Sequence, residues 1–276
     1  REILIMIFNF ETKQDLDIQK KFLKDGYIIS NFQNKNEVNK IQEFIVNIIK
    51  KKIKIKNNEK NIDFLNNFHK KIKLKDLNEI RVNLITELNK NVEIKKELYI
   101  QAKKIVDLIV GNELAIQKNI NLSIQLPNDS SSILNIHSDT TTGESPYQVV
   151  LWVPLMDVFK SKSMFVFPLK DSLKTIKNLN RLSSFDRYFK DNKKKIKFLN
   201  LKFGQFLIFS PNLLHGNVIN KTTETRFSLN IRLKSLFSPY NKIKGNDRKL
   251  GYFYFPLNVK PTTILGSNYE LPKFKK

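Results

Sequence analysis

The chain has 276 residues, of which 41% are hydrophobic, so it is long and apolar enough for a sizeable buried core and is not a disordered protein. It contains no cysteine, which excludes disulfides, thiolate metal ligands and a cysteine nucleophile. Its formal net charge of +23 is uneven, with +5 over residues 1–150 and +18 over residues 151–276.

The first 110 residues are predicted to be mainly helical. They begin with an apolar run at 3–8, whose six residues are too few for a membrane span or a signal-peptide core, so we expect a cytoplasmic protein without membrane contact. A short apolar strand is expected at 27–29. Apolar residues at helical spacing predict helices at 15–24, 36–49, 62–72, 74–88 and 92–110.

After residue 111, short β-branched and aromatic runs alternate with Pro, Gly, Asn and Ser, which favours a β-sandwich or barrel. Strands are predicted at 119–126, 133–137, 147–153, 164–168, 197–202, 206–209, 215–219 and 225–234. The segment 169–192 is predicted to be a basic helical insertion. The sequence has no linker and no repeat, so we expect a single domain, 1–276, with helical support (1–110), a β core (111–237) and a tail that wraps the core as loops (238–276).

Two of the three histidines lie in a pattern typical of a metal site. His137 and Asp139 follow the strand expected over 133–136, where alternation places both side chains on one side. His215 follows the strand at 206–209. Two imidazoles and one carboxylate fill one face of an octahedral metal and leave three positions open, as in non-haem Fe(II) oxygenases. The open positions suit a bidentate 2-oxo acid and dioxygen.

Arg226 opens the last predicted strand, eleven residues after His215. A guanidinium binds a carboxylate in bidentate geometry, so Arg226 suits the far carboxylate of the 2-oxo acid better than a lysine would. Ser228 shares its strand face and adds a hydroxyl donor.

The stretches HSDTTTGESPYQVVLWVPLMDV (137–158), KSMFVFP (162–168), FGQFLIFSPNLLHGN (203–217) and TRFSLNIRLKSLFSPY (225–240) resemble iron- and 2-oxoglutarate-dependent oxygenases of the phytanoyl-CoA dioxygenase-like superfamily, and most of all its sporadic carbohydrate cluster branch. Weaker similarity lies at 26–32 and 77–81. The resemblance implies a mainly β fold with α-helices, in which a double-stranded β-helix (jelly-roll) core is flanked by N-terminal helices. It also implies Fe(II) on His137, Asp139 and His215, with 2-oxoglutarate and O2 as co-substrates.

The resemblance further implies that Arg226 grips the 2-oxoglutarate carboxylate, that Trp152 lines its pocket and that Arg81 reaches the co-substrate. Trp152 is equally explained as a core residue.

Four side chains have both a functional and a structural interpretation. Asn230 and Arg232 share the strand face of Arg226, where they contact substrate, support the residues that bind the metal and co-substrate, or simply pack. Gln125, in the strand before the motif, points at the 2-oxo acid or is exposed. Glu144, in the loop after the motif, contacts substrate or caps a turn. The remaining histidine, His69, is expected to be a solvated surface residue.

These residues predict a dioxygenase that oxidises a small molecule and converts 2-oxoglutarate to succinate. A carbohydrate substrate, such as a sugar nucleotide or amino sugar, follows only from the resemblance, and the basic half suits a phosphorylated one. One alternative is an oxidative demethylase of nucleic acid, although the lysine runs lack the interleaved aromatics of a single-strand groove. Another is a non-oxidative jelly-roll protein, either a binding protein or a zinc or manganese isomerase. The sequence leaves the oligomeric state open.

Overall fold

The computed structural model describes residues 10–56, 58–240 and 248–268. The described helices are α1 (Lys13–Asp25), α2 (Lys35–Ile53), α3 (Asn61–Asn66), α4 (Leu77–Lys90), α5 (Val92–Ile109), α6 (Leu169–Lys177), α7 (Phe185–Asn192) and α8 (Pro261–Ser267). The described strands are β1 (Tyr27–Asn31), β2 (Leu114–Gln117), β3 (Asn121–Gln125), β4 (Gln148–Pro154), β5 (Phe165–Val166), β6 (Lys197–Phe198), β7 (Gln205–Phe209), β8 (His215–Gly216), β9 (Arg226–Ser235) and β10 (Tyr254–Leu257).

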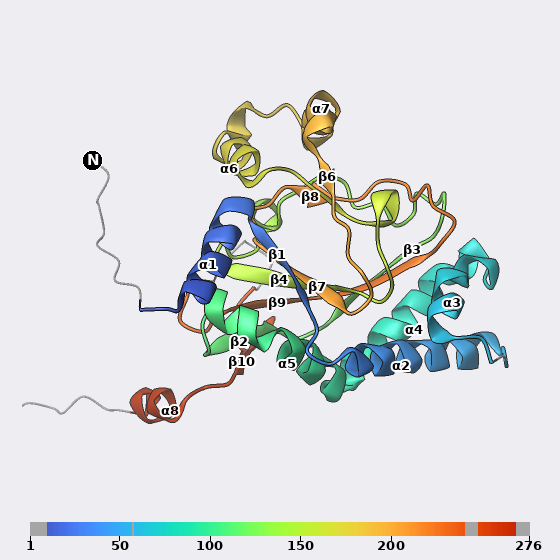
Figure 1. Ribbon diagram of the computed structural model, residues 1–276, viewed down its shortest axis with the longest axis horizontal. Helices are drawn as coiled ribbons and strands as arrows, with labels where there is room; N and C mark the ends of the chain where they lie inside the picture. Colours follow the sequence, from blue (N-terminus) through green and yellow to red (C-terminus); the bar gives the residue numbers. More distant parts are fainter. Residues whose placement is uncertain (1–9, 57, 241–247, 269–276) are drawn as a thin grey trace, which may run out of the picture.

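The strands form two antiparallel sheets. The larger sheet has the order β1-β7-β4-β9-β2-β10, and β3 also pairs with β9. The smaller sheet has the order β6-β5-β8. Figure 1 shows α2 to α5 (the lower layer) along the lower right side of the larger sheet, and the small sheet with α6 and α7 above it. The structure is therefore a mixed α/β arrangement of antiparallel sheets with helices on both sides.

Side-chain alternation gives the two faces of the large sheet different roles. On β9, the odd-numbered residues Phe227, Leu229, Ile231 and Leu233 are buried in the hydrophobic cluster that also contains the helices of the lower layer. The even-numbered residues of β9 are polar, and Arg226, Ser228 and Lys234 among them are also buried. The polar face points away from the helical layer, toward the small sheet.

The helices of the lower layer follow from capping and spacing. The side chain of Asn34 accepts a hydrogen bond from the backbone N–H of Asn36 at the start of α2, and Asn91 does the same for α5. In α2, Val38, Ile41 and Ile45 recur at helical spacing and are buried against the sheet.

Most predicted elements are confirmed, because each long periodic segment contains a helix and the insertion at 169–192 holds α6 and α7. The helix predicted at 62–72 is divided, with α3 followed by a 3-10 turn at Phe68–Lys70. Every predicted strand except 133–137 overlaps a strand of the structure. The apolar run at 3–8 lies outside the described residues.

The strand predicted at 133–137 is wrong. This segment is irregular, and His137 alone forms an isolated bridge, with His215. The backbone of Leu134 bonds instead with Asn217, whose side chain accepts from the Leu134 N–H and whose backbone N–H donates to the Leu134 carbonyl at 3.0 Å. The apolar run is also divided in its burial, since Ile136 is buried while Leu134 is 55% exposed.

The prediction that the tail contains only loops is also wrong. The tail supplies β10, which pairs with β2 at the sheet edge, and α8. The strand β2 itself lies outside the predicted strands. Tyr254 explains this pairing, because its ring is fully buried and its hydroxyl donates to Gln148 and to Glu144. The four consecutive aromatic residues at 252–255 favour a strand, but the prediction of loops gave more weight to the Pro, Gly and Asn residues around them. The one-domain organisation stays a prediction.

Phe227 joins the sheet to the helical layer, and its removal is expected to destabilise the fold. Its ring is fully buried and meets the edge of the Phe68 ring at 5.2 Å between centroids. Phe227→Ala is expected to lower the free energy of unfolding by about 3–5 kcal/mol, as measured by urea denaturation. The control Tyr252→Ala, at a 65% exposed side chain, is expected to change it by about 0.5 kcal/mol or less. Equal effects of the two variants would contradict this packing.

Candidate metal centre

His137 and His215 are brought together by their backbones. The N–H of His137 donates to the carbonyl of His215 at 3.0 Å, and the N–H of His215 donates to the carbonyl of His137 at 2.9 Å. This reciprocal pair places the two imidazole centroids 4.3 Å apart. Residues that are 78 positions apart in the chain therefore share one site, because β8 folds beside the irregular segment that carries His137.

Gly216 permits this close approach. A Cβ atom at this position would lie 2.8 Å from the carbonyl oxygen of Leu134 and 3.0 Å from the Phe165 ring. Both distances are shorter than ordinary van der Waals contact. A glycine directly after the second histidine is thus a steric requirement of the bridge.

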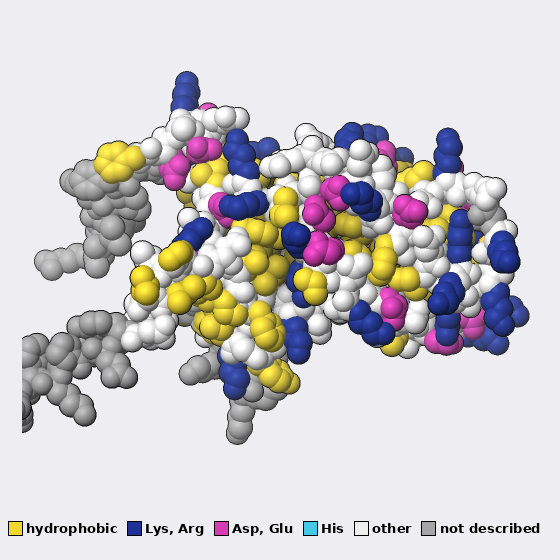
Figure 2. Space-filling model, turned by 90° about the horizontal axis from the view of Figure 1, so that it is seen from below, with side chains coloured by type: hydrophobic (Ala, Val, Ile, Leu, Met, Phe, Trp, Pro, Cys, Tyr) yellow, Lys and Arg dark blue, Asp and Glu magenta, His cyan; other side chains and the backbone are white. Residues whose placement is uncertain are grey.

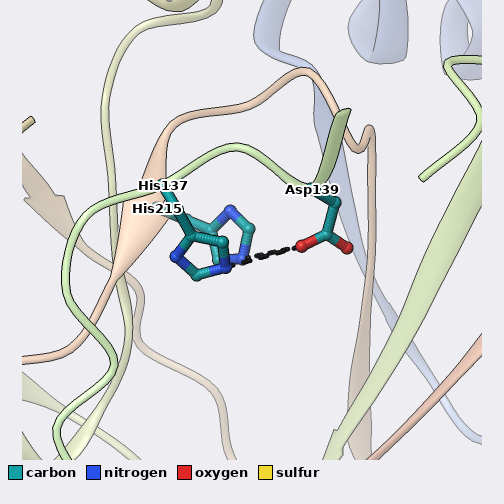
Figure 3. Close-up of side chains that lie close together, drawn as sticks. All are labelled: His137, Asp139 and His215. Carbon is teal, nitrogen blue, oxygen red and sulfur yellow. Dashed lines mark ion pairs between the residues drawn. The ribbon is translucent and has the colours of Figure 1, made fainter. Parts of the chain in front are cut away.

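Both imidazoles are oriented by backbone carbonyls. The Nδ1 atom of His137 lies 2.8 Å from the carbonyl oxygen of Asn135, and that of His215 lies 2.8 Å from the carbonyl oxygen of Leu213. A neutral imidazole that donates from Nδ1 carries its lone pair on Nε2. Figure 3 shows that both rings direct their Nε2 atoms to the same side, toward Asp139.

Asp139 completes a three-residue cluster. It begins the 3-10 turn Asp139–Thr142, and its Oδ1 atom lies 3.5 Å from Nε2 of His137 and 3.8 Å from Nε2 of His215. The three possible ligand atoms all lie within 4.8 Å of one another. The two histidines and the aspartate that the sequence singled out therefore converge on one point, although a turn rather than a strand presents the carboxylate.

The protonation states suit a metal. Burial raises the pKa of Asp139, but the neighbouring His137, His215 and Arg232 side chains lower it more, so this pKa lies below its usual range. Burial and the neighbouring His137 lower the pKa of His215 to about 4. At neutral pH the carboxylate is charged and His215 is neutral. These donors fit an Fe(II) ion with open coordination positions.

A small cavity of about 80 Å³ lies beside His215. Trp152, Met164 and Phe209 give it an apolar wall. Its polar lining comes from Arg226, Ser123, Asn230 and Asn217, and the rest from Leu134 and Gly216.

Arg226 is the cation of this cavity. Its side chain is buried, its Nη2 donates to Ser123 Oγ at 3.1 Å, and its Nη1 donates to the carbonyl of Lys162 at 3.5 Å. Within the described part of the chain it has no acidic partner, and its Nε has no hydrogen-bond acceptor. Burial lowers its pKa to about 10. A buried guanidinium without a counter-charge is costly, so this site suits a bound anion.

Other predicted residues lie around the same face. Trp152 and Asn230 line the cavity. Ser228 lies between Arg226 and Asn230 on that face of β9, and its buried hydroxyl has no hydrogen-bond partner among the described residues. Gln125 is fully buried opposite Arg226, and its amide donates to the carbonyl of Val218 at 2.6 Å, so it is not exposed.

The other three candidates, Arg81, Arg232 and Glu144, do not line the cavity. Arg81, on α4, bonds with Ser132 at 2.8 Å and so holds the segment before His137. Arg232 and Glu144 form an ion pair with a distance of 3.5 Å, and Arg232 also contacts Asp139. His69 is half-buried rather than solvated, because its Nδ1 lies 3.0 Å from the Thr225 hydroxyl.

The sequence reasoning missed Ser123, Asn217 and Arg248. Ser123 pairs directly with Ser228 across β3 and β9, so strand alternation was a signal that pointed to it. Asn217 follows the second histidine by two residues and shares its cavity. Arg248 lies in the tail, and nothing in its local sequence marks its contact with Glu144 at 3.1 Å.

The fold is shared with solved non-haem enzymes. The chain is similar to apo EctD from S. alaskensis, with 17% identity and a TM-score of 0.56 over 83% of this chain and 80% of that one. It is also similar to the apo form of the non-haem monooxygenase ThoJ, with 16% identity and a TM-score of 0.53 over 79% and 77% of the two chains. The alpha-ketoglutarate-dependent epimerase SnoN from nogalamycin biosynthesis matches with 13% identity and a TM-score of 0.50 over 84% and 87%. No family model and no curated protein sequence matches the chain.

These similarities establish the fold, and the convergent histidines and aspartate are a property of this chain itself. Within the described residues, no helix combines the length and apolar character needed to cross a lipid bilayer.

The metal centre makes a direct prediction about the three histidines. His137→Ala and His215→Ala are each expected to weaken Co(II) binding about 100-fold, since even outer partners of metal ligands are worth about 10–100-fold in affinity. Isothermal titration with Co(II) measures this. His69→Ala is the matched control and is expected to bind as the wild type does. Wild-type affinity in either cluster variant would refute the centre.

Proposed function

We propose that the chain is an Fe(II)- and 2-oxoglutarate-dependent dioxygenase with a jelly-roll core. The observation that carries this proposal is the buried Arg226 guanidinium, which has no acidic partner among the described residues. It lines the same cavity as His215. His137, Asp139 and His215 would hold Fe(II). A non-oxidative zinc or manganese isomerase, which uses no 2-oxo acid, or a simple metal-binding protein has no need of a carboxylate anchor in the cavity beside its metal.

The residues of the chain have defined tasks in this reaction. Fe(II) supplies the redox chemistry by which O2 oxidises the substrate and 2-oxoglutarate loses CO2 to become succinate. Arg226 binds the far carboxylate of 2-oxoglutarate in bidentate geometry, and Ser228 donates its unpaired hydroxyl to the same group. Trp152, Met164 and Phe209 exclude water from the bound co-substrate.

The binding of 2-oxoglutarate by Arg226 can be tested by substitution. Arg226→Met is expected to raise the KM for 2-oxoglutarate about 30-fold or more, because loss of one partner of a buried charge pair costs about 2 kcal/mol or more. Succinate formation with Fe(II) and O2 measures this, and Arg187→Met, at a side chain 74% exposed, is the control. Anaerobic addition of 2-oxoglutarate to the Fe(II) protein is expected to give a visible charge-transfer band. Absence of the band together with an unchanged KM would overturn the proposed function.

We further propose a carbohydrate substrate, for example a sugar nucleotide or amino sugar, as the sequence resemblance implies. The amides of Asn230 and Asn121, which bond with each other at 2.9 Å, support it, since amides pair readily with hydroxyl groups. Asn230 lies at the cavity, and Asn121 is exposed beside it. The basic C-terminal half favours a phosphorylated form. The cytoplasmic location stays a prediction.

Nucleic acid is the less favoured substrate. On the face shown in Figure 2, the Lys and Arg side chains are scattered, with acidic and apolar side chains between them, rather than joined in one basic stripe. Strand binding needs a continuous basic groove with aromatic side chains.

A substrate panel separates these classes. Sugar nucleotides and amino sugars are expected to stimulate the conversion of 2-oxoglutarate to succinate, as measured by mass spectrometry of succinate and of an oxidised sugar. Single-stranded DNA is expected to give neither stimulation nor salt-dependent binding. Stimulation by DNA alone would contradict the carbohydrate assignment while leaving the co-substrate assignment intact.

A further inference from the structure

The two carboxylate oxygens of Asp139 face different partners. Oδ1 lies toward the Nε2 atoms of His137 and His215, at 3.5 and 3.8 Å. Oδ2 accepts a hydrogen bond from Nη2 of Arg232 at 3.1 Å. One oxygen is therefore directed to the metal position, and the other is occupied by a cation on β9.

Arg232 is itself held at several atoms. Its backbone N–H and its Nη1 both donate to the side-chain oxygen of Gln117, at 3.2 and 3.3 Å. Its Nε lies 3.5 Å from Oε1 of Glu144. The guanidinium thus has a defined orientation between two carboxylates, those of Asp139 and Glu144, and its side chain is only 15% exposed.

Glu144 is held in position for its contact with Arg232. Its backbone N–H donates to the carbonyl of Asp139 at 3.1 Å, so one turn presents both carboxylates to Arg232. Its side chain is 1% exposed, and its carboxylate also contacts Arg248 at 3.1 Å and accepts from the Tyr254 hydroxyl at 3.3 Å. A carboxylate so enclosed orients its neighbour rather than meeting a substrate.

An aspartate carboxylate turns easily, because its terminal torsion has broad minima. A metal can therefore bind the carboxylate through one oxygen or through both. A partner on the outer oxygen removes that freedom and orients the ligand. Arg232 is suited to this task because its planar fork makes separate contacts with two carboxylates, which a lysine ammonium does not reproduce.

We propose that Arg232 is a positioning residue of the metal centre, which holds Asp139 as a one-oxygen ligand and is itself oriented by Glu144. This inference rests on the proposed metal centre and assigns Arg232 and Glu144 to the metal rather than to substrate.

The test compares two Arg-to-Lys substitutions, one at Arg232 and one at Arg187 on α7, both of which keep the charge. Arg232→Lys is expected to weaken Co(II) binding about 10-fold or more and to change the visible absorption of bound Co(II), which reports the coordination of the metal. Arg187→Lys, at a side chain that is 74% exposed and paired with Asp191 rather than Asp139, is expected to keep Co(II) affinity within about twofold of wild type and an unchanged spectrum. Thermal unfolding of the metal-free proteins verifies that both variants are folded.

The outcomes separate the two proposals. Wild-type protein that binds no Co(II) refutes the metal centre itself. Wild-type protein that binds Co(II), together with a folded Arg232→Lys variant of equal or higher affinity, refutes the positioning role alone. If Arg232→Lys does not fold, Glu144→Gln decides, because it leaves the contact between Arg232 and Asp139 but removes the orienting charge. About threefold weaker Co(II) binding in that variant supports the role, and wild-type affinity overturns it.

Discussion

The alternation of side chains along β9 is the constraint on which the rest of the structure depends. This strand lies in the middle of the sheet, between β4 and β2, with β3 also paired to it. One face, represented by Leu229 and Ile231, is committed to the helical core, so the other face must turn its polar residues toward the small sheet. A slip of one residue would exchange these faces and bury apolar groups where Arg226 and Arg232 now point.

Two arginines on that polar face illustrate how the protein treats buried charge. Arg232 lies beside Asp139 and Glu144, whose carboxylates compensate its charge. Arg226, six residues earlier on the same face, bonds with only a serine hydroxyl and a backbone carbonyl among the residues that the structure describes. The two arginines therefore differ in what they need. Carboxylates of the protein already compensate the charge of Arg232, whereas an anionic ligand would compensate the charge of Arg226.

The overall charge of +23 is less informative than these buried groups. Many lysines of the described chain form single surface ion pairs, such as Lys40 with Glu37 and Lys90 with Glu87, which are worth little in stability. Lys234 is different, since its side chain is buried, its pKa is lowered to about 8 by burial, and its ammonium lies 3.6 Å from the centroid of the Tyr240 ring. Position, more than number, decides what the cations do.

The sequence by itself determined the elements with strong periodicity and singled out the three candidate metal ligands that the structure brings together. The helices of residues 36–49 and 92–110 and the strand at 225–234 follow from local patterns, which depend only on neighbouring residues. The pattern of His137, Asp139, His215 and Arg226 was visible because few residue types bind a metal ion or a carboxylate. Tertiary structure alone decided that a turn presents Asp139, that β10 pairs with β2, and that Arg248 contacts Glu144. These features depend on contacts between segments that are distant in the chain, and such contacts leave no periodic trace in the local sequence.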